Sequence, residues 1–277
     1  MTESTLVTRL DDQGVLTVTL HRPETRNAFD TPMQGRMREI FYEASRDPGV
    51  RVLVLTGAGG AFCAGSDVRS LGGPDPTDPL AQKWAEQAIW NAHEAKVDRL
   101  RNLSEAALTL HRMGKPTVAM VRGAAAGAGM SLALACDFRI ASGSAFFLTS
   151  FARIGMSGDY GGSYFLTKLI GPAKTKELYM LSDRIEAPHA LELGILTRLT
   201  SDDELEKETY AFAHRLAKGP PIAFRYIKEN VQAALDETIE RAFETEARNM
   251  IRCRFTQDCD EAMTAFKEKR EPVFRGR

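Results

Sequence analysis

The stretch that decides the fold is GAAAGAGMSLALACDFRIASGSAFFLTSFARIGMSGDYGG, residues 123–162. A β-branched and apolar run, residues 117–122, leads into its small residues, and an apolar segment with the composition of a buried helix begins at Met130. A strand that turns through small residues into a helix presents backbone N–H groups at the helix N-terminus, where negative charge is stabilised. Further along, Asp159 stands among apolar and small residues. The stretch therefore predicts an anion-stabilising corner paired with one acid/base group.

A similar arrangement occurs earlier in the chain. Residues 51–56, RVLVLT, are apolar on both faces and predict a strand of the kind that parallel sheets bury. The glycine-rich turn AGGAFCAGSD, residues 58–67, follows and opens a helix-like segment at Asp67. Such a turn by itself indicates only that some of its glycines have positive φ. Because strand, small-residue turn and helix recur at residues 117–135, the sequence predicts two N–H corners built by the same βα geometry.

The remaining elements follow from local signals. Residues 15–20 alternate as a strand does, and Thr31-Pro32 places a capping hydroxyl at the start of a helix that we expect to run to about Ser45. Residues 80–113 predict one long helix or two, with an apolar stripe that belongs to the core or lines a pocket: Trp84, Ile89, Trp90 and Val97. Residues 202–270 are helix-rich. We therefore predict an α/β core over residues 1–200 and a C-terminal helical region over 201–277.

Composition excludes several classes of protein. With 277 residues, 43% of them hydrophobic, the chain has ample material for a large core. A net charge of -1 gives no general attraction to nucleic acid or to anionic membranes. No signal-peptide pattern or membrane-spanning run is present, and the four cysteines and five histidines lack disulfide or metal spacing. We expect a cytoplasmic protein with a small-molecule or protein partner and no metal, nucleic acid or membrane.

Two motifs of the central stretch invite other interpretations. The run GAAAGAG has neither the G-x-G-x-x-G spacing of a dinucleotide site nor the Gly-Lys-Ser/Thr of a P-loop. Residues 129–133, GMSLA, approach the G-x-S-x-G elbow of serine hydrolases, with Ala133 in place of the last glycine. The preceding strand ends several residues before Ser131, unlike in that elbow. Ser131 is otherwise a helix hydroxyl bonded to a preceding carbonyl.

Asp159 also has two interpretations. A lone carboxylate among glycines is often only a turn residue. If the neighbouring apolar side chains enclose it, however, desolvation raises its pKa to a value useful for proton transfer. The side chains expected to do so are Phe147, Leu148, Phe151, Ile154 and Met156.

The chain resembles the crotonase superfamily, the enoyl-CoA hydratase/isomerase family, over nearly its whole length. The segments that carry this resemblance are HRPETRNAF (21–29), AFCAGSD (61–67), GKPTVAMVRGAAAGAGMSLALACDFRIAS (114–142), GDYGGSYFLTKLIG (158–171) and EAMTAFKEKREPVF (261–274). The resemblance implies a ββα spiral core and a trailing helical region used for trimerisation. It also implies a homotrimer or, commonly, a dimer of trimers.

The resemblance gives the two corners a role. It implies that the backbone N–H groups of Ser66 and Ala128 hold the thioester oxygen of an acyl-CoA while its α-carbon becomes enolate-like. An oxyanion donor of this kind contributes on the order of 3 kcal/mol to lowering a barrier. Coenzyme A is then part of the substrate, and no separate cofactor is implied. The residues implied to bind coenzyme A, the last two from a neighbouring subunit, are Ala28, Ala64, Asp67, Val68, Phe266 and Lys269.

The departures from the family pattern bear on the reaction. Family hydratases carry two glutamates at the positions of Ser131 and Phe151. Hydration needs one group that orients and deprotonates water and another that donates a proton, which serine and phenylalanine supply poorly. Asp159 stands where some family isomerases keep an aspartate, including the ring-opening isomerases of phenylacetate degradation. We therefore expect isomerisation of an unsaturated acyl-CoA, with Asp159 as the catalytic acid/base.

Other activities remain open at this stage. The same enolate chemistry serves a hydratase, a C–C hydrolase or a decarboxylase, and a non-catalytic protein that binds CoA esters is a further alternative. Tyr160 either donates a hydrogen bond to the acyl group or only packs.

Overall fold

Two β-sheets form the centre of the molecule. The computed structural model describes residues 5–67, 73–74 and 78–277, and within them it places the strands in a six-stranded and a three-stranded sheet. The larger sheet has the order β1 (Leu6–Leu10), β2 (Val15–Leu20), β3 (Val52–Gly57), β4 (Thr117–Val121), β6 (Phe138–Ser142) and β9 (Arg198–Thr200). Its pairs are parallel except β1 with β2. The smaller sheet has the order β5 (Ala124–Ala126), β7 (Phe146–Leu148) and β8 (Ile185–Glu186).

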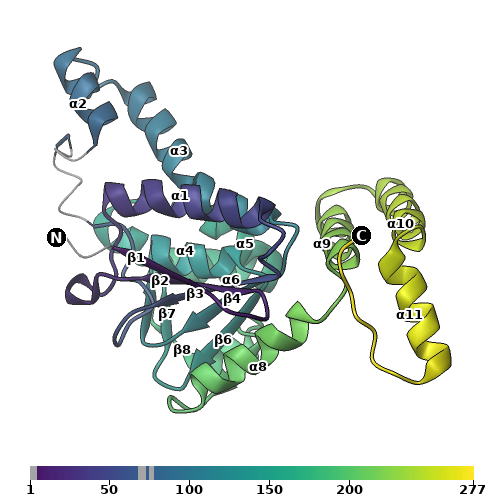
Figure 1. The fold of residues 1–277 in the computed structure, drawn as a ribbon. Coiled ribbons are helices and arrows are strands. Elements are labelled where there is room, and N and C mark those ends of the chain that lie inside the picture. The colour runs from purple at the N-terminus through teal and green to yellow at the C-terminus, as the bar shows by residue number, and fades with distance from the viewer. Residues whose placement is uncertain (1–4, 68–72, 75–77) are drawn as a thin grey trace.

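The chain winds between the two sheets. It runs from β4 in the larger sheet to β5 in the smaller one and then into α4 (Ala128–Ala135). The next repeat of this path runs from β6 to β7 and then into α5 (Gly162–Ile170) and α6 (Pro172–Leu181) (Figure 1). A return through β8 and α7 (Ala187–Glu192) leads to β9. The predicted ββα spiral is therefore confirmed. Short 3-10 helices lie at Pro23–Thr25 and Phe151–Ile154.

The predicted first helix is confirmed with a different cap. Helix α1 spans Thr31–Arg46, and the carboxylate of Asp30 accepts a hydrogen bond from the backbone N–H of Met33. The prediction of Thr31 as the capping residue was wrong by one position. Asp30 has the extended backbone of an N-cap, whereas Thr31 is already helical and precedes the proline.

The segment before β4 forms two helices, α2 (Pro79–Glu86) and α3 (His93–Arg112). Its apolar stripe is not part of the core: Ile89 is 39% exposed and Val97 is 49% exposed. Trp90 is half-buried and lies beneath the cationic groups of Lys96 and Arg99. These helices extend beyond the sheet, as Figure 1 shows, so helical periodicity alone did not reveal that the stripe faces away from the core.

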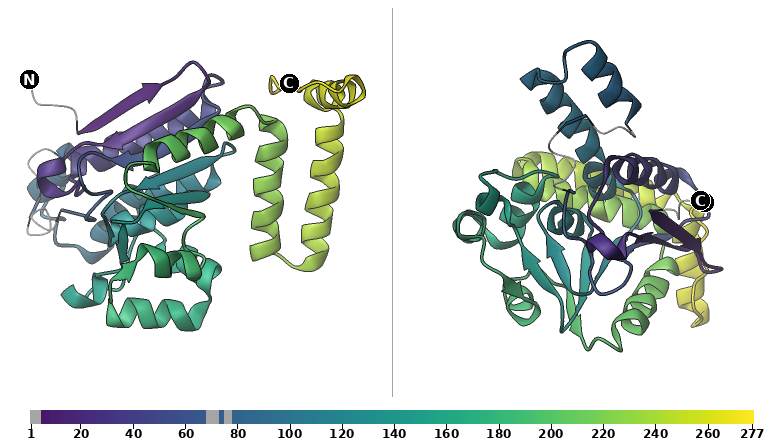
Figure 2. Two further views of the ribbon diagram at one scale, coloured as in Figure 1. Left: turned by 90° about the horizontal axis from the view of Figure 1, so that it is seen from below. Right: turned by 90° about the vertical axis from the view of Figure 1, so that its left-hand side faces the viewer.

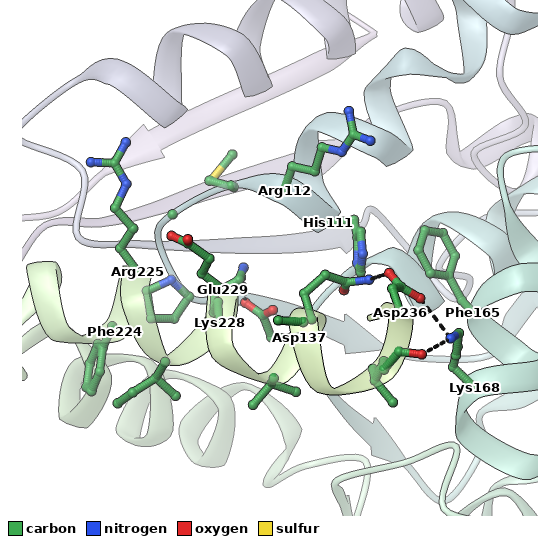
Figure 3. Close-up of a pocket in the computed structure, with 18 of the residues that line it drawn as sticks. His111, Arg112, Asp137, Phe165, Lys168, Phe224, Arg225, Lys228, Glu229 and Asp236 are labelled. Atoms are coloured by element: carbon green, nitrogen blue, oxygen red, sulfur yellow. Dashed lines mark hydrogen bonds and ion pairs between the residues drawn. The ribbon is translucent and has the colours of Figure 1, made fainter. Parts of the chain in front are cut away.

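The last helices extend away from the core. Helix α8 (Leu205–Ala217) packs on the larger sheet, whereas α9 (Pro221–Asp236), α10 (Ile239–Arg254) and α11 (Gln257–Glu268) project from it (Figure 2). A cavity of about 1210 Å³ lies where α9 and α10 border the core (Figure 3). The domain boundary at residue 200 stays a prediction. The apolar side chains exposed over residues 221–268 include Ile227, Val231, Leu235, Ile239, Phe243, Met250, Ile251, Phe255 and Phe266.

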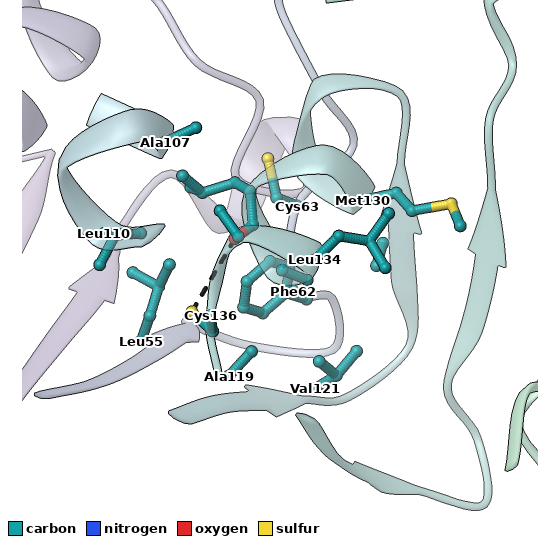
Figure 4. Close-up of a cluster of buried hydrophobic side chains, with 14 of the residues drawn as sticks. Leu55, Phe62, Cys63, Ala107, Leu110, Ala119, Val121, Met130, Leu134 and Cys136 are labelled. Atoms are coloured by element: carbon teal, nitrogen blue, oxygen red, sulfur yellow. Dashed lines mark hydrogen bonds between the residues drawn. The ribbon is translucent and has the colours of Figure 1, made fainter. Parts of the chain in front are cut away.

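The core occupies both faces of the larger sheet. Leu53 and Leu55 of β3 face α1, α3 and α4, and Val52 and Val54 face α8, as expected for a buried parallel strand. Helix α4 is buried along its whole length beside Leu110 of α3 (Figure 4). In the described part of the chain, no helix is both long and apolar enough to cross a membrane.

Candidate active site

The first corner lies at the end of the turn that follows β3. The backbone N–H of Phe29 donates to the carbonyl of Gly65 (2.8 Å), and the N–H of Asp67 donates to the carbonyl of Phe29 (2.8 Å). These two bonds fix the backbone on either side of Ser66. Among the described residues, the N–H of Ser66 has no hydrogen-bond acceptor, so it remains available to a ligand.

The second corner is the N-terminus of α4. Ala128 is the first residue of this helix, and Gly127 precedes it with φ of 51°. The first N–H groups of a helix have no acceptor within that helix, and none is found for Ala128 in the described chain. Because α4 is entirely buried, this N–H lies in a region of low polarity, where a hydrogen bond to an anion is strong.

The two corners adjoin through short backbone contacts. Cys63 donates its N–H to the carbonyl of Ala124 and accepts from the N–H of Ala126, both at 2.9 Å. A Cβ atom added to Gly65 would lie 2.9 Å from the carbonyl oxygen of Ala126 and 3.4 Å from the nitrogen of Ala128. The glycine therefore allows the turn before Ser66 to approach the start of α4. The structure thus brings together the two corners that the sequence predicted.

Asp159 lies in the loop before α5, between Gly158 (φ 125°) and Tyr160 (φ 53°). Its side chain is half-buried, and its Oδ1 atom is fully buried without a hydrogen-bond partner. Burial raises the pKa of this carboxyl from 3.8 to about 6, because the charged form loses its solvation. A carboxyl with such a pKa can both accept and release a proton near neutral pH.

The residues that enclose Asp159 differ in part from those predicted. Phe147 and Phe151 are buried, but Ile154 is 56% and Met156 is 48% exposed, so the prediction that these two enclose the carboxyl was wrong. The 3-10 helix ends at Gly155 in a left-handed turn, after which the chain runs along the surface. Tyr179 of α6 contributes instead, and its ring stacks on Phe151 at a centroid distance of 6.0 Å.

The Asp159 loop contacts both corners. The ring of Tyr160 lies 5.7 Å from that of Phe29, whose backbone pairs with Ser66. On the other side, a Cβ atom added to Gly127 would lie 3.8 Å from Phe151 Cζ. Tyr160 is 2% exposed, and its hydroxyl has no partner among the described residues. The Asp159 loop and the Phe151 ring packed on it thus lie against both corners, an arrangement that would suit the stabilisation of an enolate.

Ser131 lies on α4 with a side chain that is 1% exposed. Its hydroxyl donates to the carbonyl of Gly127 at 3.3 Å, which confirms the interpretation as a helix hydroxyl. Within the described residues, no hydrogen bond joins it to a histidine. The serine-hydrolase interpretation lacks its base here.

Comparison with known proteins identifies the family. The model of the enoyl-CoA hydratase/isomerase family matches residues 11–277. The chain belongs to the enoyl-CoA hydratase/isomerase family. It is 32% identical to a 1,2-epoxyphenylacetyl-CoA isomerase from Escherichia coli K12, over 96% of this chain and 97% of the relative. It is also 32% identical to a crotonyl-CoA hydratase from Syntrophomonas wolfei, over 92% of each chain.

A solved structure gives the same result. The crystal structure of an enoyl-CoA hydratase from Polaromonas sp. JS666 superposes with a TM-score of 0.86 at 31% identity, covering 98% of this chain and 100% of that one. The enoyl-CoA hydratase/isomerase family acts on acyl-CoA thioesters, and its members similar to this chain include both isomerases and hydratases. Family membership therefore does not decide between isomerisation and hydration.

The residues that the family resemblance assigned to coenzyme A separate into two groups. Ala28, Ala64 and Asp67 lie together beside the first corner, where Arg22 donates to the carbonyl of Ala28 (2.6 Å) and pairs with Asp67 (3.3 Å). The sequence alone did not single out Arg22 within HRPETRNAF, because the contacts of this residue depend on where Asp67 lies. Of the remaining three positions, Val68 lies outside the described residues. Phe266 and Lys269 lie at the C-terminal end of α11, which is distant from this site within one chain (Figure 1).

The cavity beside α9 is a different place from the predicted site. None of Ser66, Ala128 and Asp159 lines it. Several of its charged groups pair with one another, among them Lys228 with Asp137 at 2.6 Å and, in Figure 3, Lys168 with Asp236 at 2.8 Å. Asp159, in contrast, has a buried oxygen without a partner. In residues 5–67, 73–74 and 78–277, no group of three or more His, Cys, Asp or Glu side chains is placed to hold a metal ion.

Proposed function

We propose that this enzyme isomerises an unsaturated acyl-CoA by moving a proton between two carbons of the acyl chain. The carboxylate of Asp159 removes the proton, the N–H groups of Ser66 and Ala128 hold the thioester oxygen of the enolate, and the resulting carboxylic acid returns the proton at another carbon. The observation that carries the proposal is the buried, unpartnered Oδ1 of Asp159, with burial raising the pKa of this carboxyl to about 6.

The proposed reaction is balanced without a further reagent. One C–H bond breaks and another forms, the double bond shifts by one position, and the carboxylate is regenerated. Because no electrons leave the substrate, no redox cofactor is needed and coenzyme A enters only as part of the substrate. The two N–H groups would be most effective in a site closed to water, where a developing negative charge has few other partners.

Ser131 and Phe151 support isomerisation over hydration. The Ser131 hydroxyl is bonded to a carbonyl of its own helix, and the Phe151 side chain has no hydrogen-bonding group. Neither residue can therefore activate water, and hydration would depend on water reaching Asp159 itself. A C–C hydrolase or decarboxylase needs the same enolate stabilisation, and cleavage or CO₂ release from a member of the acyl panel below would indicate such a reaction instead.

Substrate binding and assembly are part of the proposal. We expect the region of Ala28, Ala64 and Asp67 to bind coenzyme A, since it adjoins the first corner. We expect α9–α11 to form a trimer, because they expose a series of apolar side chains that a second copy would cover. In such an assembly, Phe266, which is 85% exposed, and Lys269 would contact the coenzyme A of a neighbouring subunit.

The test is incubation with 3-enoyl-CoA and 2-enoyl-CoA esters in deuterated water, with the wild type beside Asp159→Asn. Deuterium entering the α- or γ-carbon over successive turnovers, and absent with the variant, is the expected result. A 3-hydroxyacyl-CoA product formed equally by both proteins would refute the role of Asp159. Binding of CoA esters without turnover across a broad acyl panel would instead indicate a non-catalytic binding protein.

A further inference from the structure

Tyr179 is an aromatic residue beside Asp159 to which no role has been assigned. It lies on α6, twenty positions after Asp159 in the sequence. Its ring is nearly parallel to that of Phe151, with an angle of 8° between the planes. On the loop that carries Asp159, a Cβ atom added to Gly158 would lie 3.0 Å from Tyr179 Cε1. The ring is therefore held between Phe151 and the backbone next to the catalytic carboxyl.

The hydroxyl group of Tyr179 also packs closely, against the start of α5. A Cβ atom added to Gly162, at the start of α5, would lie 2.6 Å from Tyr179 Oη and 2.2 Å from Ser131 Oγ. Both hydroxyl groups therefore lie close to the backbone of Gly162 and near each other. Only a residue without a side chain at position 162 leaves room for this pair.

Tyr179 is a neutral group in this setting. Burial and the negative charge of Asp159 raise the pKa of its hydroxyl to about 12, so it stays protonated at neutral pH and cannot deprotonate water. Asp159 presents the opposite situation, because its buried Oδ1 has no partner and would bind any water that reached it. Whether the carboxyl meets water therefore depends on what fills the space around it.

We propose that Tyr179 is a specificity-determining residue whose ring, held between Phe151 and Gly158, occupies the space from which water would reach Asp159 and the acyl chain. Water entering there would bond through its oxygen to C3 of a 2-enoyl thioester and give one proton to Asp159, which would then pass that proton to C2 and be regenerated as the carboxylate. With Tyr179 in place, the enzyme returns the proton to carbon instead. This inference rests on the proposed isomerase function.

The experiment measures how the enzyme partitions its products. The wild type, Tyr179→Phe, Tyr179→Leu and Tyr179→Ala are incubated with 3-hexenoyl-CoA and 2-hexenoyl-CoA, and the ratio of 3-hydroxyhexanoyl-CoA to isomerised product is determined by mass spectrometry. Tyr42→Ala, on the exposed face of α1, is the matched control for loss of a tyrosine. Circular dichroism establishes that each variant is folded.

We expect the ratio for Tyr179→Phe to stay within about twofold of the wild type, because the ring remains. We expect it to rise about tenfold or more for Tyr179→Leu and Tyr179→Ala, because both open the space beside Asp159 to water. Leucine preserves much of the apolar packing, so Tyr179→Leu tests whether the ring excludes water even if Tyr179→Ala does not fold. The Tyr42→Ala ratio should equal that of the wild type.

Two results overturn the inference. One is a Tyr179→Leu variant that still isomerises and forms no more hydrated product than the wild type. The other is a Tyr179→Phe variant that hydrates as much as Tyr179→Leu, which would assign the effect to the hydroxyl group. If the wild type itself neither isomerises the substrate nor incorporates deuterium, the proposed function is refuted. If the wild type is an active isomerase and Tyr179→Leu forms no additional hydrated product, only the role of Tyr179 is refuted.

Discussion

Replacing Asp159 by asparagine should change how stability depends on pH. Burial raises the pKa of this carboxyl from 3.8 to about 6, so the folded chain holds a proton that the unfolded chain releases between these two pH values. The free energy of unfolding of the wild type therefore falls as pH rises through this window. A shift of about two pKa units corresponds to a cost of about 3 kcal/mol once the carboxyl is fully ionised.

The magnitude follows from the two pKa values. The cost of the buried charge is about 1.6 kcal/mol at pH 5 and about 3 kcal/mol at pH 7.5. Asparagine does not titrate, although its amide adds its own desolvation cost, which is the same at both pH values. The stability of Asp159→Asn relative to the wild type should therefore increase by about 1.4 kcal/mol between pH 5 and pH 7.5, whatever its absolute value.

Urea denaturation of both proteins at the two pH values, at one protein concentration, measures this difference. Asp12→Asn, which removes an exposed carboxylate from the turn before β2, controls for the loss of one negative charge. We expect this control to remain parallel to the wild type, because an exposed side chain stays solvated. If the Asp159→Asn and wild-type values also change in parallel, the carboxyl is solvated in the folded protein and the reasoning about its burial is refuted.

Three further predictions concern activity and packing. The value of kcat/KM for the isomerisation should fall below pH 6, with a midpoint near the pKa of about 6 of Asp159, because protonation removes the base; a rate profile from pH 5 to 8 measures it. Gly129→Ala should lower the free energy of unfolding by about 2 kcal/mol or more, because the added Cβ would lie 2.5 Å from the carbonyl oxygen of Cys63. Gly35→Ala has open space around it and should raise the free energy of unfolding by about 0.5–1 kcal/mol. Thermal melts of both variants measure these changes. Ser131→Ala should retain kcat/KM within about tenfold, since its hydroxyl bonds a helix carbonyl; complete loss of turnover in steady-state assays would contradict this.

Several parts of the site could be predicted because they depend on local sequence. The turn that leads into α4 at Ala128 is visible as a β-branched run followed by small residues, and the similar run before Ser66 indicated a second free N–H group. The helix predicted from Asp67 onward lies outside the described residues. The raised pKa of Asp159 followed from the apolar residues near it, and the structure gives the same direction. The roles of these three residues in catalysis stay predictions until the experiments above are done.

Other parts could not be predicted, for a common reason. Ile154 and Met156 are close to Asp159 in sequence but face solvent, because the backbone turns outward at Gly155. Tyr179 is distant in sequence but stacks beside the carboxyl, because α6 packs back onto the loop. Periodicity within a helix shows which residues share a face and does not show what that face meets.

The sequence by itself indicated where several strands and helices lie, which turns contain glycine, and which family the chain resembles. Those properties depend on sterics and hydrogen bonds within a few residues of each position. Only the tertiary structure decided that Gly65 meets the start of α4, that Arg22 holds Asp67 and that Tyr179 lies beside Asp159. Such contacts join segments far apart in the chain, and their geometry is set by the packing of the whole core rather than by any local pattern.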